Sequence, residues 1–245
     1  RVFSLEQWSL LAANNQDIEK QGDTTNGYNY IILPGASLTL EGTDRLIFGK
    51  EGFKTTLTVR GNITVKADIT TGSVDISKSR IQCFGNGTII LDGGNIHFED
   101  NAILPNMNDD TGDIHPSDYI MYFTSGIYIA FGGLLKIQNT QSNIIFDRLH
   151  RCIGICISGD RFNNNSPGKL EISVGNITMK YCDTSFGFFI SDYGLLKQFG
   201  GTIDIKNITN NIRFNYFFSC GIYCGQFTNP DTIGYPYHNF RQNNG

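Results

Sequence analysis

Acidic side chains concentrate in the segment NMNDDTGDIHPSD, residues 106 to 118. Carboxylates this close together can bind a hard cation such as Ca²⁺, and a carboxylate near a histidine can do acid–base work. The spacing does not fit an EF-hand loop, because Thr111 stands where that loop needs glycine and no glutamate ends the segment. We therefore predict a solvated loop and no cofactor, and Asp109, Asp110 and Asp113 are the candidate ligands if Ca²⁺ binds.

A second group of ionisable residues lies in FDRLHRC, residues 146 to 152. A polysaccharide lyase needs a base to remove the proton alpha to a uronate carboxylate, and cations to stabilise the resulting anion. Strand alternation puts Asp147, Leu149 and Arg151 on one face and Arg148 with His150 on the other. We therefore predict that these are surface charges, and keep Asp147 and His150 as catalytic candidates.

A glycosidase would instead need two carboxylates about 5 to 9.5 Å apart. Asp160 and Asp192 follow the similar phrases ISGD and ISD, so they could stack side by side as like charges, although surface loops are the simpler prediction. We add both to the catalytic candidates. The sequence does not say which pair meets among Asp92, Glu99, Asp100, Asp147, Asp160, Asp183, Asp192 and Asp204.

The six cysteines include two pairs with the same spacing, Cys152 with Cys156 and Cys220 with Cys224. In an extended chain, residues four apart lie about 13 Å apart, which is too far to share one zinc ion. We therefore predict buried free thiols that act as small core residues, with no metal.

Aromatic side chains gather near the C-terminus, in TIGYPYHNFRQNNG. Tyr235, Tyr237, His238 and Phe240 could stack on sugar rings and are the candidate glycan-binding residues. We prefer the alternative that they pack on a following domain or a sister subunit, because this end shows no capping segment.

One apolar phrase occurs four times, as TSGIYIAFGG, CIGICIS, SFGFFIS and SCGIYCG. The first three copies are followed by a second phrase (GGLLKI, PGKLEI, GGTIDI) and a third (NIIFDRL, NITMKYC, NIRFNYF). These segments alternate with the period of two that is typical of strands, and no helical run separates them. A fixed order with a period of roughly 33 residues predicts an all-β solenoid, a parallel β-helix with three strands per coil.

This arrangement predicts ladders of stacked side chains. Ile155, Phe188 and Ile222 should form one interior ladder, and Ile137, Ile172 and Ile205 another. We expect the glycines of the first phrase to lie at a corner, where the chain turns sharply or approaches its neighbour closely. The segments DRFNNNSP and DYGLLKQF should be loops that protrude from one corner.

The first half of the sequence also consists of short apolar segments separated by polar residues, and we interpret these segments as shorter coils of the same solenoid. The predicted strands are YIIL, SLTL, RLIF, TLTV, NITV, SVDI, RIQCF, TIIL and NIHF. Before them, FSLEQWSLLAANN predicts a capping helix with a capping box from Ser4 to Gln7 and a buried face of Leu5, Trp8, Leu11 and Ala12. The resulting divisions are residues 1–27 (cap and lead-in), 28–104 (short coils), 105–118 (acidic loop), 119–225 (regular coils) and 226–245 (an extension toward a further domain or partner).

The stretch AANNQDIEKQGDTTNGYNYIILPGASLTLEG resembles the opening of pectate-lyase-like right-handed β-helix proteins, phage tailspikes among them. In those proteins a short helix precedes a strand, a Pro-Gly turn and a second strand. Residues 31–33, Pro34-Gly35 and residues 37–40 carry the likeness here. IQCFGNGTIILDGG also resembles a coil found early in such proteins. The resemblance implies a right-handed coil and, by itself, no function.

Composition limits the possible partners. The 245 residues are 40% hydrophobic and 17% charged, with a net charge of −4 and no basic stripe, so we expect no nucleic acid partner. No run approaches the roughly 18 apolar residues of a membrane span, so we expect no membrane insertion.

We predict a structural, receptor-binding segment of a phage tail spike or fibre, in the virion tail or extracellular. It should be a homotrimer whose partners are other virion proteins and host surface polysaccharide. The alternatives are a polysaccharide lyase or glycoside hydrolase of the same fold, and a bacterial surface adhesin. A monomeric enzyme should cap both ends, and because this chain shows only one cap, we favour a non-catalytic role.

Overall fold

The computed structural model describes residues 1–12, 16–50, 53, 55–71, 79–99, 101–102, 125–150, 153–159, 166–183, 186–191, 193–206, 220–224 and 239–242. This part of the chain is mostly β, with one short helix, α1 (Leu5–Ala12). The acidic loop predicted at residues 105–118 lies outside it, as does most of the predicted extension. None of its helices is long and apolar enough to cross a membrane.

Most strands belong to three long sheets. Sheet A has the order β1 (Val2–Phe3), β5 (Arg45–Phe48), β8 (Asp68–Thr71), β11 (Ile96–Phe98), β15 (Asn143–Phe146), β19 (Asn176–Met179) and β23 (Thr202–Ile205). Sheet B has the order β2 (Ile18–Asp23), β3 (Gly27–Ile32), β6 (Thr55–Val59), β9 (Ser79–Cys83), β13 (Ser125–Ile129), β17 (Ile153–Ser158), β21 (Phe186–Ser191) and β24 (Cys220–Cys224).

Sheet C has the order β4 (Ser37–Leu40), β7 (Asn62–Val65), β10 (Thr88–Leu91), β14 (Leu134–Ile137), β18 (Lys169–Ile172), β22 (Leu195–Gln198) and β25 (Asn239–Gln242). A small sheet D contains β12 (Asn101–Ala102), β16 (Leu149–His150) and β20 (Cys182–Asp183).

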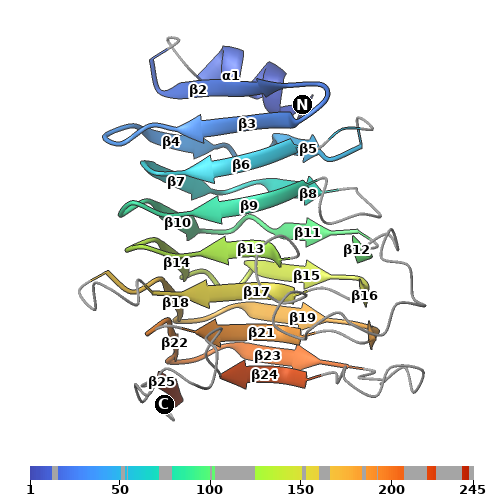
Figure 1. Ribbon diagram of the computed structural model, residues 1–245, viewed down its shortest axis with the longest axis vertical. Coiled ribbons are helices and arrows are strands. Elements are labelled where there is room, and N and C mark those ends of the chain that lie inside the picture. The colour runs from blue at the N-terminus through green and yellow to red at the C-terminus, as the bar shows by residue number, and fades with distance from the viewer. Residues whose placement is uncertain are drawn as a thin grey trace, which may run out of the picture.

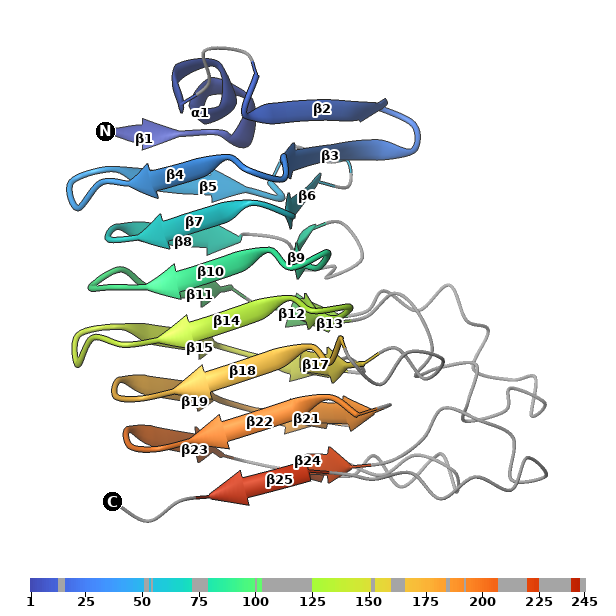
Figure 2. The same ribbon diagram turned by 90° about the vertical axis from the view of Figure 1, so that its left-hand side faces the viewer.

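The chain runs through sheets B, C and A in turn and then begins the next layer. Strands β3, β4 and β5 make one such layer, and β17, β18 and β19 make another, so the layers lie one upon the next (Figure 1). Among the described strands, each pairs in parallel with its counterpart in the adjacent layer, except that β2 and β3 pair antiparallel. Seen from the side, the layers follow one another from α1 to β24 and β25 (Figure 2). This topology is compatible with the predicted solenoid.

The core is built from columns of identical or similar apolar side chains. The first predicted ladder is confirmed, because Ile155 pairs with Phe188 and Phe188 with Ile222, and the first two are fully buried. Phe98 and Phe146 stack on each other inside sheet A, with ring centroids 4.5 Å apart and planes 7° from parallel. Each layer thereby continues the apolar interior of the one before it.

The second predicted ladder is wrong at Ile205. Ile137 does pair with Ile172 in sheet C, but the next partner in that sheet is Gln198, and Ile205 pairs with Met179 in sheet A. The segment 193–198, predicted as part of a loop, contains β22 instead. Strand β22 begins at Leu195, whereas the prediction placed the second strand of this layer after the glycine pair at 200–201.

Successive layers approach closely at the glycines of the repeated phrase, as predicted, but these glycines lie within strands β13, β17, β21 and β24 rather than at a turn between strands. A Cβ atom at Gly154 would lie 2.7 Å from the carbonyl oxygen of Gly187, and one at Gly187 would lie 2.6 Å from that of Gly221. Real Cβ atoms do not come this close to a carbonyl, so any larger residue would push the layers apart.

An asparagine ladder joins the layers along one edge of sheet A. Asn95 donates to Asp68 (2.8 Å), Asn143 donates to Asn95 (2.8 Å) and Asn176 donates to Asn143 (3.0 Å). The sequence separations are 27, 48 and 33 residues, so the number of residues per layer varies while the register is kept. The period of about 33 residues holds from Asn143 to Asn176.

Helix α1 covers the N-terminal end of the stack. Its capping box is confirmed, because the backbone N–H of Gln7 donates to Ser4 Oγ (3.1 Å) and that of Ser4 donates to Gln7 Oε1 (3.0 Å). Leu5 and Trp8 are buried as predicted. The prediction for Leu11 is wrong, since 66% of this residue is exposed, and the helix contacts the layers through its first turn.

The predicted strands of the first half occur as β3 to β7 and β9 to β11. SVDI lies outside the described residues. Four strands of the first half were not predicted: β1 and β12, which have two residues each, β8, whose sequence DITT has little apolar character, and β2, which is charged and mostly exposed. Strand β8 is the sheet A strand of its layer and lies between β5 and β11. Its Ile69 pairs with Leu46 on one side and with Ile96 on the other.

Candidate functional site

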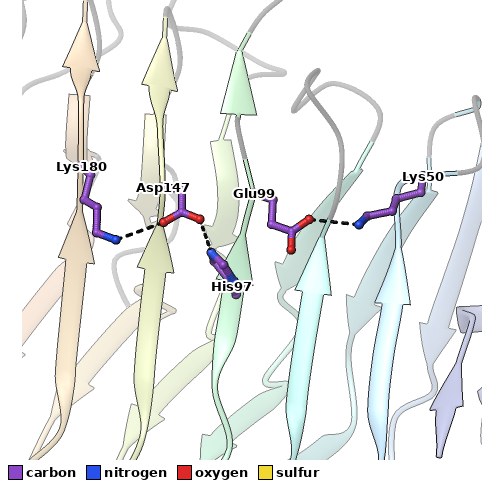
Figure 3. A network of polar contacts seen from close by, with 5 residues as sticks. All are labelled: Lys50, His97, Glu99, Asp147 and Lys180. Atoms are coloured by element: carbon purple, nitrogen blue, oxygen red, sulfur yellow. Dashed lines mark hydrogen bonds and ion pairs between the residues drawn. The ribbon is translucent and has the colours of Figure 1, made fainter.

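A polar network crosses the outer edge of sheet A, near the carboxyl ends of its strands (Figure 3). The Nε2 atom of His97 lies 2.5 Å from Asp147 Oδ2, and the Nζ atom of Lys180 lies 3.2 Å from Asp147 Oδ1. The three side chains come from three successive layers. They are 32%, 39% and 44% exposed, so the network is open to a ligand in solvent.

The core determines why these side chains point outward. Phe98 and Phe146 face the interior and pair in register, so the residues after them, Glu99 and Asp147, turn to the outside. The backbone N–H of Asp147 donates to Phe98 O (3.0 Å), which continues the parallel register past the end of β15. Lys180 takes the same position one layer on, where its N–H donates to Phe146 O (2.9 Å).

The network holds Asp147 in its charged form. Partial burial raises the pKa of this carboxyl, but the hydrogen bonds from His97 and Lys180 outweigh burial, and the net pKa is lower than the ordinary 3.8. Asp147 is therefore an anion that accepts two charge-assisted hydrogen bonds at neutral pH.

Glu99 makes a separate ion pair on the same edge, 3.0 Å from the Nζ atom of Lys50. Because Phe98 and Phe146 pair, Glu99 and Asp147 hold equivalent positions in adjacent layers. The Glu99 carboxylate is turned toward Lys50, whereas the Asp147 carboxylate lies between Lys180 and His97, as Figure 3 shows. Both residues belong to the carboxylates that the sequence singled out for a two-carboxylate mechanism.

An exposed aromatic residue follows the network directly. Tyr181 comes after Lys180, is 59% exposed, and has a φ of 50°. Its register partner in the preceding layer is Arg148, because the flanking pairs are Phe146 with Met179 and Leu149 with Cys182. A bulky residue in left-handed backbone costs about 1 to 3 kcal/mol, a strain that often marks a functional position.

The predicted alternation across FDRLHRC is wrong. Leu149 is fully buried in the core, whereas Asp147 faces outward, so the two do not share a face. The cause is the bend between β15 and β16, which interrupts the period of two. Arg148 is exposed, as predicted for a surface charge.

Most other predicted site residues fall outside the described part of the chain. These are the ligand candidates Asp109, Asp110 and Asp113, the catalytic candidates Asp160 and Asp192, and the glycan-binding candidates Tyr235, Tyr237 and His238. Only the backbone is described for two others. His150 lies in β16, and Phe240 lies in β25 opposite Leu196, in register with a buried column of sheet C.

Cys83 and Cys156 are buried, as predicted, Cys224 is half-buried, and none of these three cysteines forms a disulfide. Burial raises the pKa of Cys83 to about 12, so this thiol stays protonated. Among the described residues, no group of three or more His, Cys, Asp and Glu side chains could hold a metal ion.

The sequence reasoning missed His97 and Lys180. The signal was present, because NIHFED, NIIFDR and NITMKY align on their asparagines, and the first of these was treated only as an isolated strand. Stacking the three phrases would have placed His97, Asp147 and Lys180 near one another.

Comparison of the chain with protein-family models, with curated proteins and with solved structures gives no match.

Proposed function

We propose that the chain is a right-handed parallel β-helix and forms a rigid, receptor-binding segment of a phage tail spike or fibre. In this role it attaches to polysaccharide on the host surface. Support for a rigid rod comes from the shared interior columns and the asparagine ladder, which bind each layer to the next. The stability of such a stack adds layer by layer, and its long faces suit a chain-like ligand.

The observation that carries the proposal is Tyr181 beside the polar network. A sugar offers an apolar ring face and a rim of hydroxyl groups. Tyr181 presents an exposed aromatic ring, while Lys180, the residue before it, and Asp147, in the adjacent layer, supply a donor and an acceptor. The proposed site therefore combines the two kinds of contact that a sugar requires.

Binding of the purified chain to an array of bacterial surface polysaccharides tests the proposal. Tyr181→Ala should remove most of the signal. Tyr193→Ala is the matched control, because Tyr193 is also a tyrosine with positive φ but lies in the turn before β22. Absence of binding by the parent chain, or equal loss in both variants, would contradict glycan attachment at this site.

The proposed spike is a homotrimer that works with other virion proteins, in the virion tail or outside the cell. Light scattering over a dilution series tests this part. A mass of three chains that persists on dilution supports it, and a monomer contradicts it.

A depolymerase of the same fold is the second candidate. It is favoured by Glu99 and Asp147, whose carboxylates occupy equivalent positions in adjacent layers. The neighbours of Asp147 hold it in its charged form, and Glu99 is paired with Lys50, whereas hydrolysis needs one protonated acid. Release of reducing ends by the parent chain but not by Glu99→Gln or Asp147→Asn would establish this second function.

A further inference from the structure

We propose that the outer edge of sheet A binds an anionic sugar. The ligand's carboxylate or sulfate ester lies between Lys180 and Lys206, and its ring lies on Tyr181. The inference rests on the glycan attachment proposed above, and it adds the chemical class of the glycan and the position of its charge.

Two lysines occupy equivalent positions in successive layers. The backbone N–H of Lys180 donates to Phe146 O (2.9 Å), and that of Lys206 donates to Met179 O (2.8 Å). Phe146 and Met179 pair in register, so the two lysines are neighbours about 4.8 Å apart along the stack. Like charges directly opposite each other in a sheet are unfavourable, so each ammonium group here lies beside a compensating carboxylate.

The carboxylate that pairs with each ammonium group is itself partly exposed at the surface. Lys180 Nζ lies 3.2 Å from Asp147 Oδ1, and Lys206 Nζ lies 2.6 Å from Asp204 Oδ2. The lysine side chains are 44% and 59% exposed, and surface pairs of this kind contribute little to stability. Both ammonium groups can therefore turn to a ligand's anion at small cost to the fold.

The aromatic ring supplies the second contact. Four non-glycine residues in the described chain have positive φ: Asn86, Phe131, Tyr181 and Tyr193. Asparagine tolerates this backbone, but aromatic residues rarely adopt it. Turn formation alone therefore does not explain why an aromatic residue stands at the other three positions. Of the three, Tyr181 alone follows one of these lysines directly, and it is more exposed than Phe131 (59% against 48%).

The two contacts together select for charge. A ring platform alone accepts any sugar with a free apolar face, neutral or charged. Two adjacent ammonium groups add charge-assisted hydrogen bonds only when the sugar carries an anion. The edge should therefore prefer an acidic sugar to the neutral sugar of the same backbone, and the preference should weaken as salt screens it.

The experiment compares dextran, carboxymethyl-dextran and dextran sulfate, which share one backbone, by calorimetric titration of the full chain. The test variant carries Lys180→Gln and Lys206→Gln. The control variant carries Lys169→Gln and Lys197→Gln, which removes the same charge from sheet C. Circular dichroism confirms that both variants fold.

We expect at least one charged dextran to bind about tenfold or more tightly than dextran, and the test variant to lose this advantage while the control keeps it. Preference for carboxymethyl-dextran or for dextran sulfate then identifies the anion. Equal binding of all three, absence of binding by all three, or equal loss in the two variants overturns the inference. Binding of neutral glycans on the array, abolished by Tyr181→Ala, would leave glycan attachment intact in that case.

Discussion

The imidazole of His97 and the carboxylate of Asp147 meet across two layers, with Nε2 and Oδ2 2.5 Å apart, although 50 residues separate them in sequence. The other oxygen of Asp147 binds Lys180, which lies 33 residues further along the chain. One carboxylate thus links three consecutive layers on the outside of sheet A. It is the counterpart, on the surface, of the asparagine ladder at the other end of the same strands.

This linkage makes stability depend on pH. The pKa of Asp147 in the folded chain is below 3.8, so the carboxylate stabilises the fold above that pH and loses its contribution as pH falls through the folded-state pKa. Because Asp147 is partly exposed, Asp147→Asn should cost only about 1 kcal/mol near pH 6. Urea denaturation of both chains from pH 6 to pH 2 should show the difference shrinking toward zero. A difference that stays constant with pH would contradict the ionic origin of the effect.

The asparagine ladder should be more sensitive to mutation than the surface network. Asn143 donates to Asn95, accepts from Asn176, and also donates to the carbonyl oxygen of Gln141. Asn143→Ala would remove all three hydrogen bonds and leave the Asn176 side chain without this acceptor, although Asn95 Oδ1 would still accept from the backbone N–H of residue 143. We expect a cost of about 1 to 3 kcal/mol in the free energy of unfolding. Gln141→Ala is the control, because Gln141 is exposed and contributes its backbone oxygen to this contact. Equal stability of the two variants in urea would show that the ladder does not hold the layers.

The sequence predicted the parts of this fold that depend on local rules. Period-two patterns located most strands, and the repeated Gly154 and Gly187 marked the register of sheet B, because only glycine fits under the next layer's carbonyl. The capping box at Ser4 was predictable for the same reason, since it involves groups three residues apart.

The rest of the fold depends on the number of residues in each layer, which local rules do not determine. The separation from Asn95 to Asn143 is 48 residues and that from Asn143 to Asn176 is 33, so a fixed period cannot place every strand. That is why Ile205 was assigned to the wrong sheet, and why His97 was not recognised as a neighbour of Asp147. Both errors concern contacts between layers, which require the register of the whole stack.

The close approach of layers at the repeated glycines predicts a large effect of a single methyl group. Gly154→Ala would place a Cβ 2.7 Å from the carbonyl oxygen of Gly187, so we expect a loss of about 2 kcal/mol or more, or failure to fold. Gly42→Ala is the control, because its Cβ would meet only Lys66 O, at 3.4 Å, and its φ is not positive. Thermal unfolding of the two variants measures the difference. A midpoint for Gly154→Ala equal to that of the control would contradict the packing argument.

The buried thiol of Cys83 should be inert in the folded chain. Its pKa of about 12 leaves almost no thiolate at pH 8, and the side chain is fully buried beneath the turn at Gly87. We expect iodoacetamide to leave Cys83 unmodified in the native chain and to alkylate it in urea, as read by mass spectrometry of peptides. The half-buried Cys224 should react faster than Cys83 under native conditions. Rapid native labelling of Cys83 would show that the stack opens there.

Tyr181 should show opposite effects on stability and on binding. Tyr181→Gly relieves the strain of a φ of 50° and should raise the free energy of unfolding by about 1 kcal/mol, because glycine adopts this backbone freely. The same change removes the ring and should weaken glycan binding about tenfold. Tyr181→Ala separates the two effects, since alanine keeps the strain but also lacks the ring.

Urea denaturation and polysaccharide titration of the three chains measure both quantities. A tyrosine kept for packing would make Tyr181→Gly less stable than the parent chain, and a tyrosine without any role would leave binding unchanged. Only a residue retained for ligand contact gives a more stable chain that binds more weakly, because 59% of Tyr181 faces solvent and the strained backbone brings the fold no benefit of its own.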